Sequence, residues 1–371
     1  SHYYELHLDT SKNEPEITKE VEVSWEKEHG TKVEMEMEAK YQRGKRSVAE
    51  YMKYTAVSNP HATLTLVEPD GVRTEYLRAT TKLPVQPKEI KPHPDGIELG
   101  ILINMLKSTE SRTLQSFLTN DFSRIGPGTA KKVCEEANVY PNARPSRIAK
   151  QEADNLLKAI RKQKFMSPPT DCLSPIGDEL LIKSLKKEFD AEFYTAVTRP
   201  ASVYRGNPFK IEAAIAYGGS LEREKPAEII RFANRVPLQY QQAACSITKS
   251  TIATRWKQYG LHQSNGNIPV GPVVITVHIA SVWVPFTSES KEAIAHYPEI
   301  IKEIKLAVQE CGRQLGKYVR KQHKAKDEAK KKSYLEKYVP IIGEALKEIL
   351  PDTKPTIVTK NLQEVLEKSR K

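Results

Sequence analysis

The chain contains a nearly unbroken apolar run that reads Val273-Val274-Ile275-Thr276-Val277-His278-Ile279-Ala280. Strands buried on both faces have such continuous runs, whereas half-buried strands alternate apolar and polar residues. We therefore predict a central strand at residues 273–282. After this strand, apolar residues recur at steps of three and four, which predicts one long amphipathic helix. These residues are Ile300, Ile304, Val308, Cys311, Leu315 and Tyr318.

Further elements on both sides of the central strand indicate a mixed α/β domain at residues 170–350. On its N-terminal side, a helical pattern is followed by three strand-like runs, at residues 177–189, 193–198, 209–217 and 229–233. On its C-terminal side, the long helix runs into a charged block at Arg320–Lys332. We expect a shorter second helix at residues 334–350, before Pro351, and then a C-terminal tail at residues 351–371.

A second region, residues 87–169, has the periodicity of helices. Proline-rich joints bound it at Pro84–Pro94 and Ser167–Pro169, where proline disfavours helix and stiffens the chain. Between them, apolar stripes at helical spacing occupy residues 97–106 and 114–122. A small all-α domain is the expectation.

The first 86 residues have the pattern of a mixed α/β sheet. Alternating apolar and charged residues predict half-buried strands at 3–8, 21–25 and 33–37. A helix is expected at residues 47–55. A hairpin should follow, with strands at 62–67 and 73–78 around a Pro69-Asp70-Gly71 turn. Because the first strand begins at residue 3, we expect its partners to lie upstream, in a longer protein.

Composition argues against a membrane protein and against a protein held together by disulfides or zinc, and it leaves open a protein that binds a polyanion. No apolar run reaches the ~18–20 residues of a membrane helix, and the four cysteines have no CxxC spacing, so we expect buried thiols of a cytoplasmic protein. The net charge is +11, but residues 1–85 carry a balance of −3, so the basic excess begins after them. Attraction to a polyanion such as DNA explains this excess, and so does a solvated basic surface.

Three groups of short motifs follow one another along the chain. The first group is His29-Gly30-Thr31-Lys32-Val33, Ser47-Val48-Ala49-Glu50-Tyr51 and Asn59-Pro60-His61-Ala62. The second is Lys88-Glu89-Ile90-Lys91-Pro92-His93-Pro94, leading into Gly96–Leu106. The third is Arg231-Phe232-Ala233-Asn234-Arg235-Val236-Pro237-Leu238, Trp256-Lys257-Gln258-Tyr259-Gly260-Leu261 and Pro285-Phe286-Thr287-Ser288-Glu289-Ser290-Lys291-Glu292. In this order the motifs resemble the B subunit of archaeal-type DNA topoisomerase VI, over nearly the whole chain.

The resemblance implies an α+β, multidomain fold with three parts. Residues 1–86 would be the C-terminal half of a GHKL (Bergerat) ATPase α/β sandwich, and residues 87–169 a helix-two-turns-helix domain. Residues 170–350 would be the transducer, an α/β domain of the ribosomal-protein-like βαβ fold. Its long C-terminal helix would reach the A subunit, which carries the DNA-cleaving tyrosine, so no tyrosine of this chain is expected to act as a nucleophile.

The resemblance also implies an activity, cofactors and partners. Such a protein couples the binding and hydrolysis of ATP to the passage of one DNA duplex through another, in an A2B2 heterotetramer that contains a homodimer of B subunits. ATP and Mg²⁺ are the expected cofactors. Their ligands would lie in the missing N-terminal part, because this chain has neither a DxGxG nor a GxGxxG motif.

Without those motifs the chain alone is not expected to hydrolyse ATP, and two other functions stay open. One is a non-catalytic adaptor that holds a DNA-cleaving partner on DNA. The other is a stand-alone basic module that binds DNA without the A subunit. A salt series of DNA-binding measurements separates these functions.

The resemblance assigns nucleotide contacts to Gly30, Thr31 and Lys257. In the family, the threonine hydroxyl helps to fix the water and carboxylate that recognise adenine, and a transducer lysine reaches the γ-phosphate. Lys257 lies between Trp256 and Tyr259, which are expected to anchor its loop. A Gly-Thr pair at a hairpin end and a surface lysine are the simpler interpretations. Gln258 and Lys249 are weaker candidates for the same role.

Other residues are candidates for DNA contact or for a purely structural role. Arg124–Ala130 resembles a helix-hairpin-helix turn, in which backbone amides bind a DNA phosphate. Gly126, Gly128, Lys131 and Lys132 are therefore candidate DNA contacts; a tight turn that needs glycine for packing is the alternative. The Lys324–Lys332 block is either a contact surface or a solvated helix end. We expect His93 and His278 to be structural, and we predict no catalytic residue and no metal ligand in this chain.

Overall fold

The computed structural model describes residues 1–9, 14–349 and 360–361. They form two compact units, Ser1–Gln42 and Arg43–Lys371. The predicted C-terminal tail at 351–371 lies almost wholly outside the described residues.

The first unit contains an antiparallel hairpin of β1 (His2–Asp9) and β2 (Glu14–Glu22). Two strand predictions are wrong here. Strand β2 ends at Glu22, so it only overlaps the strand expected at 21–25, and residues 33–37 form no strand. Alternation alone does not make a strand, because the backbone N–H and C=O groups need a neighbouring strand with which to pair. No described strand pairs with residues 33–37, and Val33, Met35 and Met37 are exposed.

The second unit is built on a six-stranded sheet with the order β5-β7-β10-β8-β9, in which β6 pairs with β7. Its strands are β5 (Phe193–Thr198), β6 (Ser202–Tyr204), β7 (Asn207–Tyr217), β8 (Glu228–Ala233), β9 (Val236–Pro237) and β10 (Val273–Ser281). Strand β10 runs antiparallel to β7 and parallel to β8, and all of its residues are buried. The predicted central strand is therefore confirmed.

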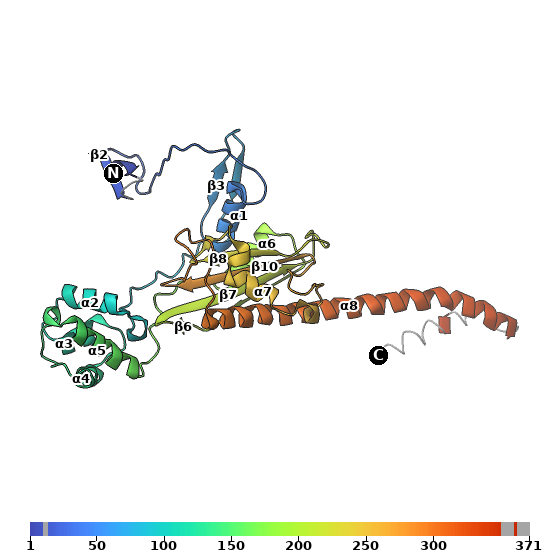
Figure 1. Ribbon diagram of the computed structural model, residues 1–371. Coiled ribbons are helices and arrows are strands. Elements are labelled where there is room, and N and C mark those ends of the chain that lie inside the picture. The colour runs from blue at the N-terminus through green and yellow to red at the C-terminus, as the bar shows by residue number, and fades with distance from the viewer. Residues whose placement is uncertain (10–13, 350–359, 362–371) are drawn as a thin grey trace. The chain divides into compact units, whose positions relative to one another are not determined.

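Helices cover both faces of this sheet (Figure 1). One face packs against α7 (Ser246–Ile252) and the first half of α8 (Pro298–Ile349), through Ile300, Ile304, Val308, Cys311 and Leu315. The other face packs against α6 (Asp178–Glu188) and α1 (Val48–Ser58). Beside α1 lies the predicted hairpin, β3 (Leu64–Val67) with β4 (Arg73–Tyr76).

Helix α8 corrects the expectation of two separate C-terminal helices. It continues from Pro298 to Ile349 through the charged block that was expected to end it. Between residues 320 and 332 there is no glycine or proline, and Lys, Gln, Glu and Ala favour helix. An i,i+4 pair between Lys324 and Glu328, 3.8 Å apart, offsets part of the repulsion between like charges.

A separate apolar core holds together α2 (Leu99–Ser108), α3 (Leu114–Asp121), α4 (Pro127–Glu136) and α5 (Lys150–Lys162). The chain enters and leaves this helical region along two adjacent segments, where Lys88 N donates to Asp171 O at 2.9 Å. His93 accepts from Asp95 N at Nδ1, so its Nε2–H donates to Met166 O at 3.0 Å. His93 thus has the structural role expected of it.

Candidate functional site

Lys257 lies on a short 3₁₀ turn, Trp256–Tyr259, that buried groups hold in place. The Trp256 side chain is fully buried, and its Nε1–H donates to Thr251 O at 2.7 Å. The Gln263 side chain closes the turn from the other side. It accepts from Trp256 N at 3.1 Å and donates to Ile252 O at 2.8 Å. As the sequence predicts, the aromatic residues anchor this loop.

The same turn is seated on helix α8, where glycine makes room for it. A Cβ on Gly312 would lie 2.5 Å from the Tyr259 ring, and a Cβ on Gly316 would lie 3.3 Å from Tyr259 Cα. At the end of the turn, Gly260 has φ +92°, and a Cβ there would lie 2.7 Å from a Val319 methyl group. The turn is therefore packed directly against α8.

The side chain of Lys257 itself is exposed and has no hydrogen-bond or ion-pair partner among the described residues. A flexible ammonium on a rigid turn is suited to contact an anion that lies outside the sheet domain. Lys249, the weaker candidate, is also exposed and lies near His296 of the same domain. Burial, together with the charge of Lys249, lowers the pKa of His296.

We expect Gly312→Ala to destabilise the protein by about 1–3 kcal/mol, because overpacking against the Tyr259 ring outweighs the helix propensity that alanine gains. The matched control is Gly100→Ala in α2, where an added Cβ meets nothing within 4 Å. That variant should be neutral or slightly more stable. Denaturant unfolding of the two variants measures the difference in their free energies of unfolding. Equal values would show that the Tyr259 ring can move aside without cost.

Gly30 and Thr31 lie in the first unit, on an exposed segment without helix or strand. Gly30 has φ +148°, and a Cβ there would meet the Trp25 ring at 3.6 Å. The Thr31 hydroxyl has no hydrogen-bond partner among the described residues. Their predicted contact with adenine stays a prediction.

Helix α4 begins at the Gly126-Pro127-Gly128 turn, with Gly126 as its N-cap. Packing does not require these glycines, because a Cβ on Gly126 or Gly128 would meet nothing within 4 Å, and neither has a positive φ. The first turn of α4 is thus open, and exposed Lys131 and Lys132 follow it. Lys131 pairs with Glu135 at 3.8 Å, whereas Lys132 has no partner among the described residues.

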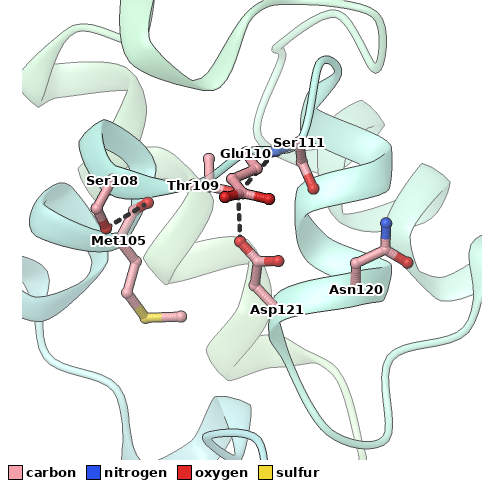
Figure 2. A pocket seen from close by; sticks show the side chains of 7 residues that line it. All are labelled: Met105, Ser108, Thr109, Glu110, Ser111, Asn120 and Asp121. Carbon is pink, nitrogen blue, oxygen red and sulfur yellow. Dashed lines mark hydrogen bonds between the residues drawn. The ribbon is translucent and has the colours of Figure 1, made fainter.

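An open hollow of about 630 Å³ lies elsewhere in the helical region, between the end of α2 and the end of α3 (Figure 2). Thr109 Oγ1 donates to the Asp121 carboxylate and accepts from Ser111 N at 3.1 Å. With Glu110 beside it, this lining carries two carboxylates and no cation. These two carboxylates would repel a DNA phosphate, so the lining of the hollow offers no phosphate site.

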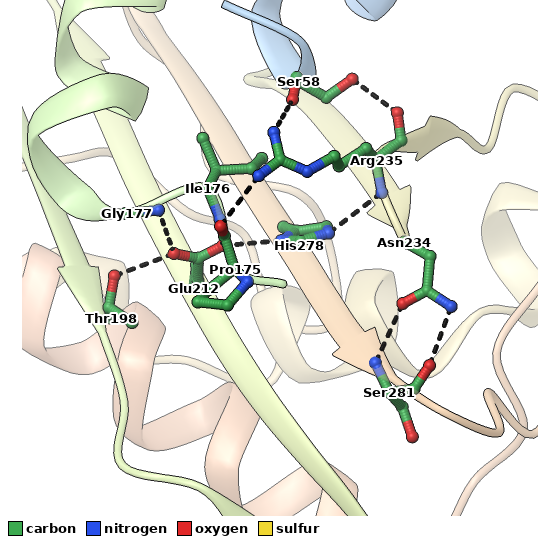
Figure 3. A network of polar contacts seen from close by, with 10 residues as sticks. All are labelled: Ser58, Pro175, Ile176, Gly177, Thr198, Glu212, Asn234, Arg235, His278 and Ser281. Atoms are coloured by element: carbon green, nitrogen blue, oxygen red, sulfur yellow. Dashed lines mark hydrogen bonds and ion pairs between the residues drawn. The ribbon is translucent and has the colours of Figure 1, made fainter. Parts of the chain in front are cut away.

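A buried polar network in the sheet domain centres on Glu212 of β7 (Figure 3). The Glu212 carboxylate is fully buried and accepts four hydrogen bonds of 2.7–2.9 Å, from Ile176 N, Gly177 N, Thr198 Oγ1 and His278 Nδ1. Burial alone would raise the pKa of Glu212, but the hydrogen bonds from His278 and the two backbone amides outweigh it and lower the pKa. Each carboxylate oxygen accepts from one backbone N–H and one side-chain donor, a geometry that fits the ionised form.

His278 of β10 is neutral in this network. Its Nε2 accepts from Arg235 N at 3.1 Å, and since a backbone N–H only donates, the ring proton is on Nδ1 and donates to Glu212. The structural role predicted for His278 agrees with this geometry. Sequence reasoning missed Glu212 and Arg235, although an acidic residue within the apolar run Phe209–Tyr217 was a signal for a buried partner.

The described residues contain no cluster suited to metal binding: no three His, Cys, Asp or Glu side chains come together as possible ligands. All four cysteines are buried free thiols, as predicted. None of the described helices has the length and apolar character needed to cross a membrane.

The chain is similar to one known protein family and to several known proteins. The family model described as "Topoisomerase VI B subunit, transducer" matches residues 168–331. The B subunit of type 2 DNA topoisomerase 6 from Methanococcoides burtonii is 48% identical over 362 residues, which are 96% of this chain and 58% of the relative. The B subunit of the same description from Saccharolobus islandicus is 36% identical over 371 residues, covering 98% of this chain and 68% of the relative.

A more distant likeness is the B subunit of DNA gyrase from Myxococcus xanthus, with 18% identity and a TM-score of 0.23 over 33% of this chain and 34% of that one. The chain spans 58% of the length of the Methanococcoides burtonii relative. With its transducer match and its identity to these relatives, the chain belongs to the family of topoisomerase VI B subunits.

Proposed function

We propose that the chain is the transducing part of a type IIB topoisomerase, which converts the state of bound ATP into DNA strand passage. In this proposal residues 1–86 are the C-terminal half of a GHKL ATPase domain, 87–169 a helix-two-turns-helix domain and 170–350 the transducer. Its partners are the A subunit, DNA and a second copy of the B subunit, in an A2B2 heterotetramer. ATP and Mg²⁺ would be held mainly by residues of the ATPase domain outside this chain.

One observation carries the proposal: Lys257 is a cation without a partner among the described residues, on a turn that is seated on α8. ATP and ADP differ at the γ-phosphate, so a cation that contacts this group distinguishes the two states. A ligand shifts a conformational equilibrium only by its differential affinity for the two conformations, and the Lys257–phosphate contact would supply that difference. Gly30 and Thr31 would contribute to adenine recognition.

Helix α8 would carry the signal over a long distance. The Tyr259 ring lies against Gly312, so a displacement of the turn displaces the helix. At 1.5 Å per residue, a helix of 52 residues is about 80 Å long. Its first half is buried against the sheet, and its second half extends beyond it (Figure 1). The extended half would reach the A subunit.

The test is relaxation of supercoiled DNA by the full-length protein assembled with the A subunit. We expect relaxation with ATP and Mg²⁺, and none with ADP. Relaxation that proceeds equally well without nucleotide would contradict the coupling. An assembled complex that binds DNA but never relaxes it with ATP would favour a holding function instead.

We propose that the open N-terminus of α4 contacts a DNA phosphate, with Lys131 and Lys132 adding charge. Lys132→Ala should lower the slope of log affinity against log salt by about 1, because one phosphate contact is lost. Binding to different sequences should weaken uniformly. Lys158→Ala is the control, since Lys158 pairs with Asp154 at 2.7 Å on another helix. Equal slopes for the two variants would remove α4 from the DNA-binding surface.

A further inference from the structure

The turn between β8 and β9 has an unusual residue in a strained position. Asn234 and Arg235 both have positive φ, +45° and +68°. Two-residue hairpin turns of this kind favour Asn-Gly, since glycine adopts positive φ without steric cost. Here an arginine stands where glycine would be favoured. Backbone strain at a long cationic residue indicates that its side chain is required.

The Arg235 side chain bridges two segments that are far apart in the sequence. Its Nη1 donates to Ser58 O at 3.1 Å, at the end of α1, and its Nη2 donates to Pro175 O at 2.9 Å, just before α6. The backbone of Arg235 adds to the same contact, since Arg235 O accepts from Ser58 Oγ at 2.6 Å. Figure 3 shows this fork between the ends of the two segments.

The turn is itself fixed to the centre of the sheet. Arg235 N donates to His278 Nε2, and His278 is held by the buried Glu212. The Asn234 side chain accepts from Ser281 N at 2.9 Å and donates to Ser281 O at 2.8 Å, as a paired strand would. The backbone that carries the guanidinium is therefore fixed to β10. Through Arg235, the end of α1 is connected to this central strand.

Helix α1 makes further contacts with the same face of the sheet domain. Val57 is fully buried in that core, Tyr54 Oη donates to Glu228 at 2.7 Å, and Lys53 Nζ lies 4.0 Å from the centre of the Phe189 ring. These contacts lie along the helix, whereas Arg235 binds the backbone at its C-terminal end. The Arg235 guanidinium thus adds a side-chain attachment at the end of α1, beside the hydrogen bond from Ser58 Oγ to Arg235 O.

We propose that Arg235 is a positioning residue for coupling: it ties the C-terminal end of α1 to the transducer sheet, so that the two move as one body. This inference rests on the proposed function, because the movement it organises is the one driven by ATP. Motion of the ATPase-domain residues that precede α1, relative to the transducer, then occurs on the N-terminal side of α1. The turn that carries Lys257 packs on one face of the sheet, and α1 packs on the other face.

The test is Arg235→Gly in the full-length protein assembled with its A subunit. Glycine keeps the backbone N–H and C=O contacts and relieves the positive φ, so only the guanidinium contacts are lost. Amides in the last turn of α1, Thr55–Asn59, should exchange with solvent about tenfold faster, since the tie no longer opposes local opening. The number of ATP molecules hydrolysed per relaxation event should rise several-fold, measured at a temperature at which the variant is fully folded.

The matched control is Lys291→Gly. Lys291 is exposed, has φ +56° and has no side-chain partner among the described residues, so this change relieves the same strain without removing a contact. Unchanged exchange in Thr55–Asn59 of the Arg235→Gly variant would overturn the tie. Faster exchange with an unchanged ratio of ATP to relaxation would overturn its role in coupling. If wild type shows no ATP-dependent relaxation, the proposed function fails, and the exchange measurement still decides whether Arg235 holds α1.

Discussion

Lys257→Ala in the full-length protein is expected to reduce ATP-driven DNA relaxation by about 10- to 100-fold. A hydrogen bond between an ammonium and a phosphate contributes about 1.5–3 kcal/mol, and each 1.4 kcal/mol corresponds to a factor of about ten. The exposed Lys257 side chain makes no hydrogen bond or ion pair within the described part of the chain, so its loss should leave the fold intact. Relaxation rates at saturating ATP, with the Tm measured beside them, give the result.

Two further variants sharpen this test. Lys257→Arg keeps the charge and should keep part of the activity, whereas Lys249→Ala removes another exposed cation of the same domain and should leave relaxation unchanged. If Lys249→Ala shows the loss and Lys257→Ala does not, the switch role belongs to Lys249. A fall in Tm for Lys257→Ala would mean that this side chain has a structural partner.

The elements that sequence predicts best are those whose pattern reflects their own burial. Strand β10 is buried on both faces and reads as an unbroken apolar run. The first half of α8 packs along one face and reads as a stripe. The loop of Lys257 is also predictable, because two large aromatic residues flank a lysine. In each case the signal lies within a few residues of the feature.

What sequence missed depends on partners that are far away in the chain. Residues 33–37 alternate like a strand, yet no described strand lies beside them. Glu212 and His278 are 66 positions apart, and only the antiparallel register of β7 and β10 pairs them. Arg235 and Ser58 are 177 positions apart. Nothing local in the sequence distinguishes this arginine from a surface residue, except that it follows Asn234 where glycine would be expected.

Glu212→Ala is expected to have the largest effect on stability, about 3–5 kcal/mol, because it leaves several buried hydrogen-bond donors without their acceptor. Four donors would lose their acceptor inside the protein: two backbone amides, Thr198 Oγ1 and His278 Nδ1–H. The matched control is Glu222→Ala, whose exposed carboxylate pairs with exposed Lys225 at 2.6 Å. Exposed pairs contribute about 0–1 kcal/mol. Denaturant unfolding followed by Trp256 fluorescence compares the two.

Glu212→Gln separates the charge of this group from its shape. Glutamine has the same size but carries an NH₂ group, which would face one of the donors that now point at the carboxylate. His278 has no tautomer that relieves this conflict, because moving its proton to Nε2 would place it against Arg235 N–H. We therefore expect Glu212→Gln to cost about 2–4 kcal/mol. Stability within 0.5 kcal/mol of wild type (roughly the limit for a neutral surface change) would show that the network adapts.

The pKa of Glu212 makes the same point through the pH dependence of stability. A carboxyl group whose pKa is lower in the folded state than in the unfolded state stabilises the protein above the unfolded pKa. That stability is lost as the pH falls through the folded pKa, because the folded protein must then take up a proton it resists. Wild type should thus lose more stability than Glu212→Gln as the pH is lowered below about 4. Parallel curves would mean that the pKa of Glu212 is the same in the folded and the unfolded state, and would contradict the stabilisation of its charged form by the network.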